Sequence, residues 1–112
     1  MDCLFCKIVS GDIPSKKVYE NEYIYAFYDI DPQAPVHVLF IPKAHIAGVD
    51  AVTPENSQVF SKIFEAIAKT AHELKLESGY RVVSNIGEHG QQSVRHLHFH
   101  LLGGRQMAWP PG

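Results

Sequence analysis

Residues 96–102 alternate histidine with large apolar residues, and this segment limits the possible fold more than any other part of the chain. Successive side chains of a β-strand point to opposite faces. We therefore expect a strand over 96–102 whose apolar face packs on the core through Leu97, Phe99 and Leu101. The other face carries His96, His98 and His100. Three imidazoles in a row stabilise a sheet less than Val or Ile would, so the pattern favours a metal site or a catalytic histidine site over a solvated surface.

The rest of the chain predicts an α+β fold in a single domain over 1–112, with an antiparallel sheet of about five strands. Strands are expected mostly in adjacent pairs, over 17–20, 23–29, 36–41, 80–86 and 96–102. A short helix is expected over 4–10, ended by Gly11. The long helix is expected to begin after Thr53 as its N-cap, to keep helical spacing as far as Leu74, and to stop before Gly79.

Composition and charge exclude several classes of protein. The chain is 46% hydrophobic and 20% charged, which is enough apolar material for a core and too little charge for disorder. Ten Lys and Arg against twelve Asp and Glu give no broad basic surface, so we expect no nucleic-acid partner. No apolar run approaches about 18 residues and the first residues do not resemble a secretory signal, so we expect no membrane partner.

The two cysteines, Cys3 and Cys6, are separated by two residues. A secreted domain of this size normally carries more cysteines, spread along the chain. We therefore expect a cytoplasmic protein with reduced thiols. The spacing suits a metal knuckle or a redox pair, although no strand precedes it as in a thioredoxin-like unit.

Hydrogen-bond donors lie just before the three histidines. They are Asn85, Gly87, Gly90, Gln92 and Ser93, which supply amide, main-chain N–H and hydroxyl groups. Such donors suit a phosphate or another oxyanion. Beside a row of histidines, this loop therefore indicates a phosphate site more than an ordinary turn.

Four stretches together resemble the histidine triad (HIT) family, and within it the branch of histidine triad nucleotide-binding proteins. Residues 96–102 match the family signature of three histidines alternating with apolar residues, and the further matches are residues 27–37, 90–94 and 102–112. The resemblance covers nearly the whole chain in order. It implies the HIT-like fold and a two-fold homodimer joined through the long helix and a strand.

The resemblance implies hydrolysis of purine nucleoside phosphoramidates, of the adenosine 5′-monophosphoramidase type, with AMP or GMP as the nucleotide. His98 would be the nucleophile and would form a nucleotidyl-histidine intermediate. Imidazole suits this role because it is nucleophilic near pH 7 without first losing a proton. Phosphate contacts and catalytic help are expected from His37, His100, Asn85, Gln91 and Ser93. Gln91 stands where the family pattern commonly has Gly, and its N–H is expected to donate to phosphate.

The resemblance also implies a place for the nucleoside. Asp29 would accept hydrogen bonds from the ribose hydroxyls, and Trp109 of the tail would approach the site of the partner subunit. The purine slot would be formed by Phe5, Ile8, Ile30 and Leu39. The residues alone would predict ordinary core positions for these four, and a turn-starting role for Asp29.

A structural zinc ion is the second expectation that the resemblance supports. The set would be Cys3, Cys6, His45 and His96. Four protein ligands would close the coordination sphere and leave no place for a reactive water, so the ion would be structural. His96 could give its ring to zinc and its carbonyl to His98.

Three other functions remain open at this point. The chain could be a non-catalytic module that binds purine nucleotides, or a hydrolase of dinucleoside polyphosphates. It could also be a metal-handling protein that uses the row of histidines as ligands. Catalysis itself is expected to need no cofactor.

Overall fold

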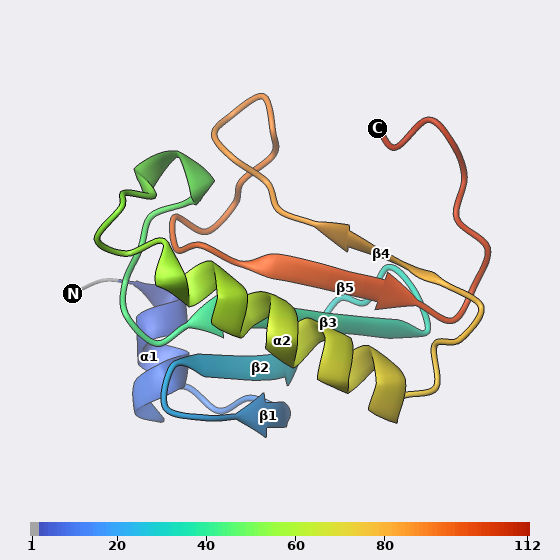
Figure 1. The fold of residues 1–112 in the computed structure, drawn as a ribbon, viewed down its shortest axis with the longest axis horizontal. Helices are drawn as coiled ribbons and strands as arrows, with labels where there is room; N and C mark the ends of the chain where they lie inside the picture. Colours follow the sequence, from blue (N-terminus) through green and yellow to red (C-terminus); the bar gives the residue numbers. More distant parts are fainter. Residues whose placement is uncertain (1–2) are drawn as a thin grey trace.

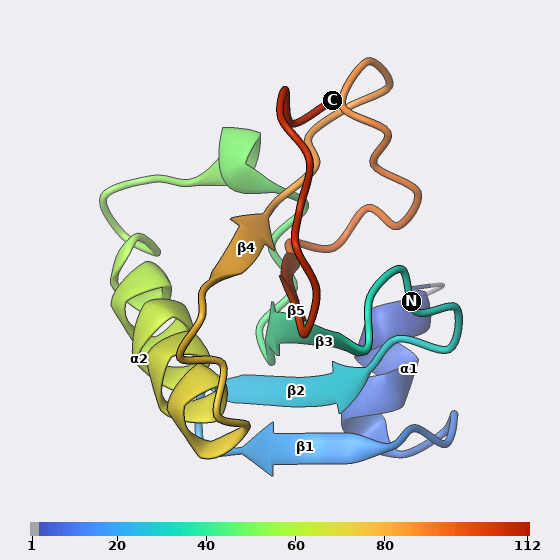
Figure 2. The ribbon, with the colours of Figure 1, turned by 90° about the vertical axis from the view of Figure 1, so that its right-hand side faces the viewer.

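Five strands form one antiparallel sheet in the order β1-β2-β3-β5-β4, with a helix on each face (Figures 1 and 2). The computed structural model describes residues 3–112. Its elements are α1 Leu4–Ser10, β1 Lys17–Glu20, β2 Ile24–Tyr28, β3 Val36–Pro42, the 3₁₀ helix η1 Val49–Ala51, α2 Gln58–Glu73, β4 Tyr80–Val83 and β5 Phe99–Gly103. The predicted α+β class and antiparallel sheet are confirmed.

The sheet separates two hydrophobic clusters because its strands alternate. In β2, Ile24 and Ala26 belong to the cluster that α2 covers, while Tyr25 and Phe27 belong to the cluster beside α1. The buried residues of α2 recur at helical spacing: Ile63, Ala66, Ile67, Thr70 and Ala71. Figure 2 shows α1 and α2 on opposite faces of the sheet.

The long helix begins later than predicted. Thr53 is not its N-cap, since α2 starts at Gln58 after Ser57. The main-chain N–H of Thr53 donates to Asn56 Oδ1 at 2.8 Å. Asn56 N–H and Val59 N–H then bond the carbonyls three residues before them. These tight turns occupy the segment that the predicted N-cap at Thr53 had assigned to the first helical turn.

The end of α2 also precedes the predicted stop at Gly79. Lys75 has φ 61°, in the left-handed region that normally favours glycine. Its N–H donates to His72 O at 3.1 Å, and Leu76 N–H donates to Ala71 O at 3.0 Å. This pair of bonds is the Schellman arrangement. The residue that terminates the helix, just beyond its last turn, is therefore a lysine, which no sequence rule marks as a stop.

The last strand begins at Phe99, so His96 and His98 lie before it and not inside it as predicted. Pairing with β3 ends at Phe40 and Phe99. Pro42, which has no N–H to donate, stands where the ladder would continue. Leu97 N–H bonds Ile46 O instead, at 2.6 Å. Leu97, Phe99 and Leu101 are nevertheless buried in the α2-side cluster, as the alternation predicts.

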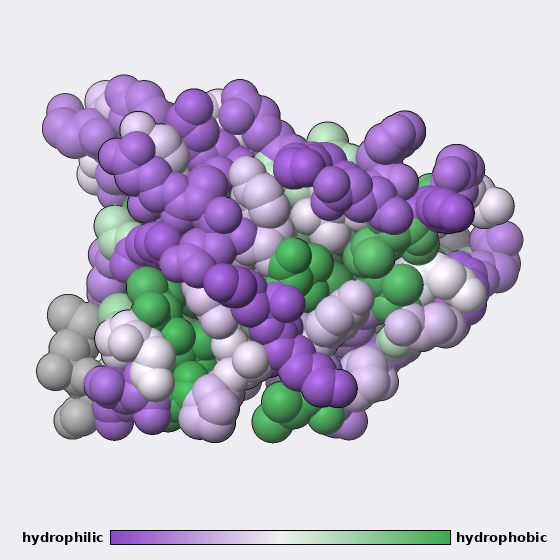
Figure 3. All heavy atoms as spheres, turned by 90° about the horizontal axis from the view of Figure 1, so that it is seen from below, coloured by the Kyte–Doolittle hydropathy of each residue, from purple (hydrophilic) through white to green (hydrophobic). Residues whose placement is uncertain are grey.

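The surface carries separate apolar patches. Figure 3, seen from the β1 edge, shows hydrophobic residues interrupted by hydrophilic ones. Large side chains more than two-fifths exposed include Leu4, Tyr23, Phe64 and Tyr80. Within the described residues, none of the helices has the length and apolar character needed to cross a membrane.

Candidate active site and metal centre

Three histidines meet on the face of the sheet that α1 covers. His37 comes from β3 and His100 from β5, where His100 is in register with Leu39. His98 lies one residue before β5. Ring centroids are 5.1 Å apart for His37 and His100, and 5.1 Å apart for His98 and His100. The three imidazoles therefore form one contiguous cluster.

His98 is held in a single orientation with one ring nitrogen left for chemistry. Its Nδ1 lies 2.7 Å from the carbonyl oxygen of His96. A carbonyl only accepts, so Nδ1 carries the proton and Nε2 keeps its lone pair. The ring is 4% exposed and meets the Phe5 ring edge-on, with centroids 5.1 Å apart. The carbonyl of His98 accepts a hydrogen bond from Ser84 Oγ at 2.8 Å, which fixes the main chain as well.

His37 and His100 are linked by a hydrogen bond whose direction follows from their neighbours. Gln33 N–H donates to His37 Nδ1 at 3.1 Å, so the His37 proton is on Nε2. That N–H lies 2.9 Å from His100 Nδ1, which must accept. His100 therefore carries its proton on Nε2 and can donate it. Asp29 Oδ2 lies 3.5 Å from His37 Nε2 and contributes charge more than a hydrogen bond.

Burial keeps these rings neutral. It lowers the pKa of His37, although Asp29 and Asp31 oppose the effect. It also lowers the pKa of His98, against the hydrogen bond to His96 O and the charge of Asp29. Burial, followed by the neighbouring His98 and His37, lowers the pKa of His100 to about 4. All three rings are therefore neutral near pH 7, each with one N–H.

Polar groups of the loop after β4 form hydrogen bonds largely within the loop. One amide hydrogen of Asn85 donates to Gly90 O at 2.7 Å, so part of the expected phosphate donor is engaged within the loop. A Cβ at Gly90 would lie 2.3 Å from Ile86 O, which explains why glycine stands there. Gln91 has φ 63° and is exposed, as is Ser93. The left-handed conformation at Gln91 accounts for the glycine of the family pattern.

Gln92 anchors this loop through all the hydrogen-bonding capacity of its side-chain amide. Its Nε2 donates to Ala47 O at 2.8 Å and to Val94 O at 3.0 Å. Its Oε1 accepts from Gly87 N–H at 3.1 Å and from Arg95 at 2.6 Å. The loop is thereby tied to the segment that follows β3.

A cleft of about 840 Å³ opens beside His37, while His98 and His100 are not among its lining residues. Only some of the residues expected to bind the nucleoside line it. Asp29, Ile30 and His37 line the cleft. The side chains of Phe5, Ile8 and Leu39 do not line it, because they are packed in the cluster under α1. Ile30 is fully exposed and Trp109 is 81% exposed.

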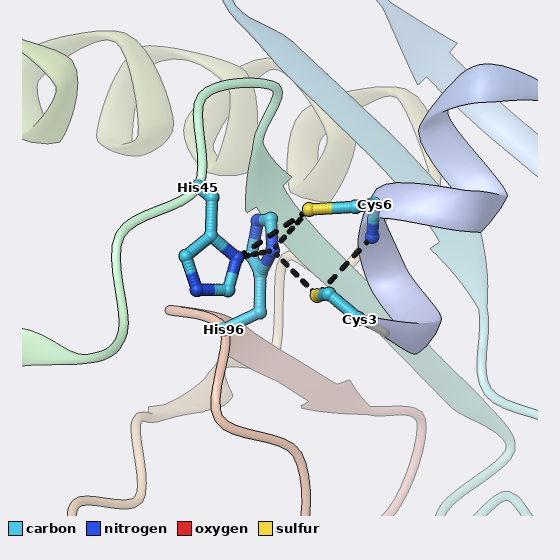
Figure 4. Close-up of side chains that lie close together, drawn as sticks. All are labelled: Cys3, Cys6, His45 and His96. Carbon is cyan, nitrogen blue, oxygen red and sulfur yellow. Dashed lines mark hydrogen bonds between the residues drawn. The ribbon is translucent and has the colours of Figure 1, made fainter. Parts of the chain in front are cut away.

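Four side chains from distant parts of the chain converge at the other end of this face (Figure 4). Cys3 precedes α1 and Cys6 lies within it, His45 follows β3, and His96 precedes β5. His96 Nδ1 lies 3.3 Å from Cys3 Sγ, 3.6 Å from Cys6 Sγ and 3.2 Å from His45 Nδ1. Cys6 Sγ lies 3.4 Å from His45 Nδ1. All four ligand atoms lie within 4.8 Å of one another.

The distances fit a tetrahedral metal ion. Zn–N and Zn–S bonds of about 2.05 and 2.3 Å imply N···N separations of roughly 3.3 Å and N···S separations of roughly 3.5 Å. His96 Nε2 lies 2.9 Å from Pro42 O and must donate to it, so Nδ1 has its lone pair free for a metal. Asp29, His37 and His100 form a second set close enough for a metal. There the 2.9 Å N···N distance is that of a hydrogen bond.

The sequence is that of a member of the HIT family. The model of the HIT domain matches residues 10–107, which is most of the chain, and the resemblance inferred from the motifs is thereby confirmed.

Proteins similar to this chain include solved structures and a curated relative. A HIT family hydrolase from Legionella pneumophila is 51% identical with a TM-score of 0.97, covering 99% of this chain and 100% of that one. A histidine triad nucleotide-binding protein from Candida albicans is 37% identical with a TM-score of 0.84, covering 99% and 85%. A 14 kDa zinc-binding protein from Zea mays is 47% identical over 97% of this chain and 87% of its own.

Sequence reasoning missed several residues that fix the main chain and the loops around the histidines. They are Ser84, Gln33 and Arg105, besides the full role of Gln92. Ser84 directly follows β4. A hydroxyl at the end of a strand can replace a main-chain hydrogen bond of the sheet, and this was the signal available in the sequence. Gln33 acts through its main chain, which leaves no signal in the identity of the residue.

Proposed function

We propose that this chain is a hydrolase of the nucleotide-binding branch of the HIT family and that it cleaves the P–N bond of purine nucleoside phosphoramidates. The observation that carries the proposal is the orientation of His98, whose Nδ1–H is committed to His96 O while Nε2 keeps its lone pair. The names of the Legionella and Candida proteins, a hydrolase and a nucleotide-binding protein, support the same class.

The first step forms a bond from His98 Nε2 to the α-phosphorus and breaks the P–N bond to the amine. The electron pair of that bond leaves with the amine, whose nitrogen takes up a proton from solvent, so that a neutral amine departs. The charge that develops on the His98 ring is stabilised by the Nδ1–H···O bond to His96. His100 is proposed to donate a hydrogen bond from its Nε2–H to a phosphate oxygen, because His37 fixes the proton on that nitrogen.

The second step releases the nucleotide. Water attacks phosphorus, the bond to His98 Nε2 breaks, and that nitrogen recovers its lone pair. The water proton passes to solvent and replaces the one that the amine took up, which restores the starting state. Ser93 and the N–H of Gln91 are proposed to hold the phosphate oxygens, together with the remaining amide hydrogen of Asn85.

The cleft is proposed to receive the nucleoside. Asp29 lies at its wall, 3.5 Å from the ring of His37, so its carboxylate can accept from a ribose diol beside the reacting phosphate. Ile30 offers a fully exposed apolar surface to the purine. Phe5 supports the site by packing against His98, and Ile8 and Leu39 pack in the same cluster beneath it.

A structural zinc ion is proposed at Cys3, Cys6, His45 and His96. The free Nδ1 of His96 and the distances among the four ligand atoms support it, as does the name of the maize relative. When bound, zinc would supply structural cross-linking and no reactive water. The protein residues would then fix α1 against the sheet on which His98 lies.

The test is hydrolysis of an adenosine phosphoramidate by the wild-type protein and by His98→Ala. We expect turnover in the wild type, a nucleotide trapped on His98 in rapidly quenched samples, and a loss of about 10⁴-fold or more in kcat for the variant. Near-normal turnover by His98→Ala would refute the mechanism. Binding of AMP without turnover would indicate a non-catalytic module, and preferred cleavage of a dinucleoside polyphosphate would indicate the other hydrolase class.

A further inference from the structure

The C-terminal tail is joined to the histidine cluster through the main chain of Gln33. On one side, Gln33 N–H donates to His37 Nδ1 at 3.1 Å. On the other side, Gln33 O accepts from Arg105 Nε at 3.3 Å and from a terminal nitrogen of Arg105 at 3.1 Å. Its side chain takes no part, since its amide donates to Asp31 O.

A second contact brings the tail against the same loop. Gly104 has φ 91°, and a Cβ at this position would lie 2.9 Å from Pro35 Cβ. The close approach needs glycine both for its conformation and for its lack of a side chain. Residues 104–105, which follow β5, therefore pack on the 31–35 loop between β2 and β3, an arrangement that can be followed in Figure 2.

The position of Gln33 decides which nitrogen of His37 carries the proton. While Gln33 N–H donates to Nδ1, the proton stays on Nε2 and His100 Nδ1 accepts it. If Gln33 moved away, Nδ1 could take the proton and Nε2 would become an acceptor. His100 would then donate from Nδ1 and lose the proton on Nε2.

We propose that Arg105 is a positioning residue that, through the main chain of Gln33, keeps His37 in the tautomer that donates to His100. The tautomer is a property of the protein alone. Its effect on catalysis rests on the proposed function, in which the Nε2–H of His100 donates a hydrogen bond to the reacting phosphate.

The experiment compares wild type, Arg105→Ala and Arg105→Lys by NMR of protein labelled with ¹⁵N at histidine, in which ring nitrogen shifts report the tautomer. We expect the Nε2–H form of His37 in the wild type and an increased share of the Nδ1–H form in Arg105→Ala. Arg105→Lys keeps one donor and should lie between the two. Arg105 is exposed, so both variants are expected to fold, and Arg105→Gln replaces Arg105→Ala if thermal unfolding shows otherwise.

The matched control is Arg81→Ala. Arg81 also holds the tail by donating to a main-chain carbonyl, that of Ala108, at 2.7 Å, but it does not contact Gln33. Its removal should leave the His37 tautomer unchanged. A shift of equal size in both variants would overturn the proposal, because it would mean that any loosening of the tail perturbs His37.

Kinetics complete the test. In phosphoramidate hydrolysis we expect Arg105→Ala to lower kcat about tenfold, part of the roughly 10²–10³-fold that one preorganised hydrogen-bond donor contributes, with KM nearly unchanged. A wild-type tautomer in Arg105→Ala would overturn the inference, whatever the rate. If the wild type hydrolysed no phosphoramidate, the proposed function would fail, and the NMR comparison would still decide the role of Arg105.

Discussion

At the scale of single residues, the site depends on imidazoles that the fold keeps neutral. The pKa of His100 is lowered from 6.5 to about 4, chiefly by burial. Between these two values the unfolded chain binds a proton at this position and the folded chain does not. Protonation there favours unfolding, so the contribution of His100 to stability is fully present above pH 6.5 and is lost as the pH falls toward 4.

We therefore expect the free energy of unfolding, measured by urea titration, to fall between pH 7 and pH 4.5, and to fall less in His100→Gln. The variant is compared with wild type at each pH, which removes the contribution of groups common to both. Parallel curves for the two proteins would contradict the assigned burial of His100.

At the scale of elements, α1 is attached to the sheet by the four proposed zinc ligands. We expect one zinc per chain by elemental mass spectrometry, lost in Cys6→Ser and retained in His98→Ala. Loss of the ion should cost about 2 kcal/mol or more, which corresponds to a fall of roughly 8 °C or more in Tm. Two ions per chain, one of them lost in His100→Ala, would contradict the assignment and favour a metal role for the histidine row.

Local signals predicted the elements that depend on local structure. The bounds of α1 and β1 agree with prediction, and Gly11, with φ 88°, ends α1 as expected. The wrong predictions concern the ends of elements that depend on contacts outside the local sequence pattern. The start of β5 depends on Pro42 and Ile46 O, and the end of α2 depends on a left-handed lysine.

The candidate site also has parts that the sequence predicts and parts that it does not. Alternation placed His100 on a face opposite Leu101, and the resemblance to the HIT family named the four residues that converge around His96. The sequence does not show that an amide hydrogen of Asn85 donates to Gly90 O. It also does not show that the cleft is lined without Phe5, Ile8 and Leu39. Those facts depend on side-chain packing that a linear pattern does not contain.

At the scale of the whole molecule, we propose a two-fold homodimer through α2 and β4. β4 is an edge strand, and Phe64 of α2 and Tyr80 and Val82 of β4 are exposed. Light scattering should give twice the chain mass for wild type and a lower mass for Val82→Arg. Val49→Arg is the control, because Val49 is equally exposed, at 38%, but lies in η1. A wild-type mass equal to one chain would exclude the dimer.

His96 contributes to two sites at once, with its ring in the cysteine–histidine cluster and its carbonyl on the nucleophile. An exchange at position 96 removes the ring and its hydrogen bond to Pro42 O but keeps the carbonyl, so it reaches His98 only by displacing the main chain that the ring holds. An engineer who wants a metal-independent version of this protein should redesign positions 3, 6 and 45 and leave position 96 untouched.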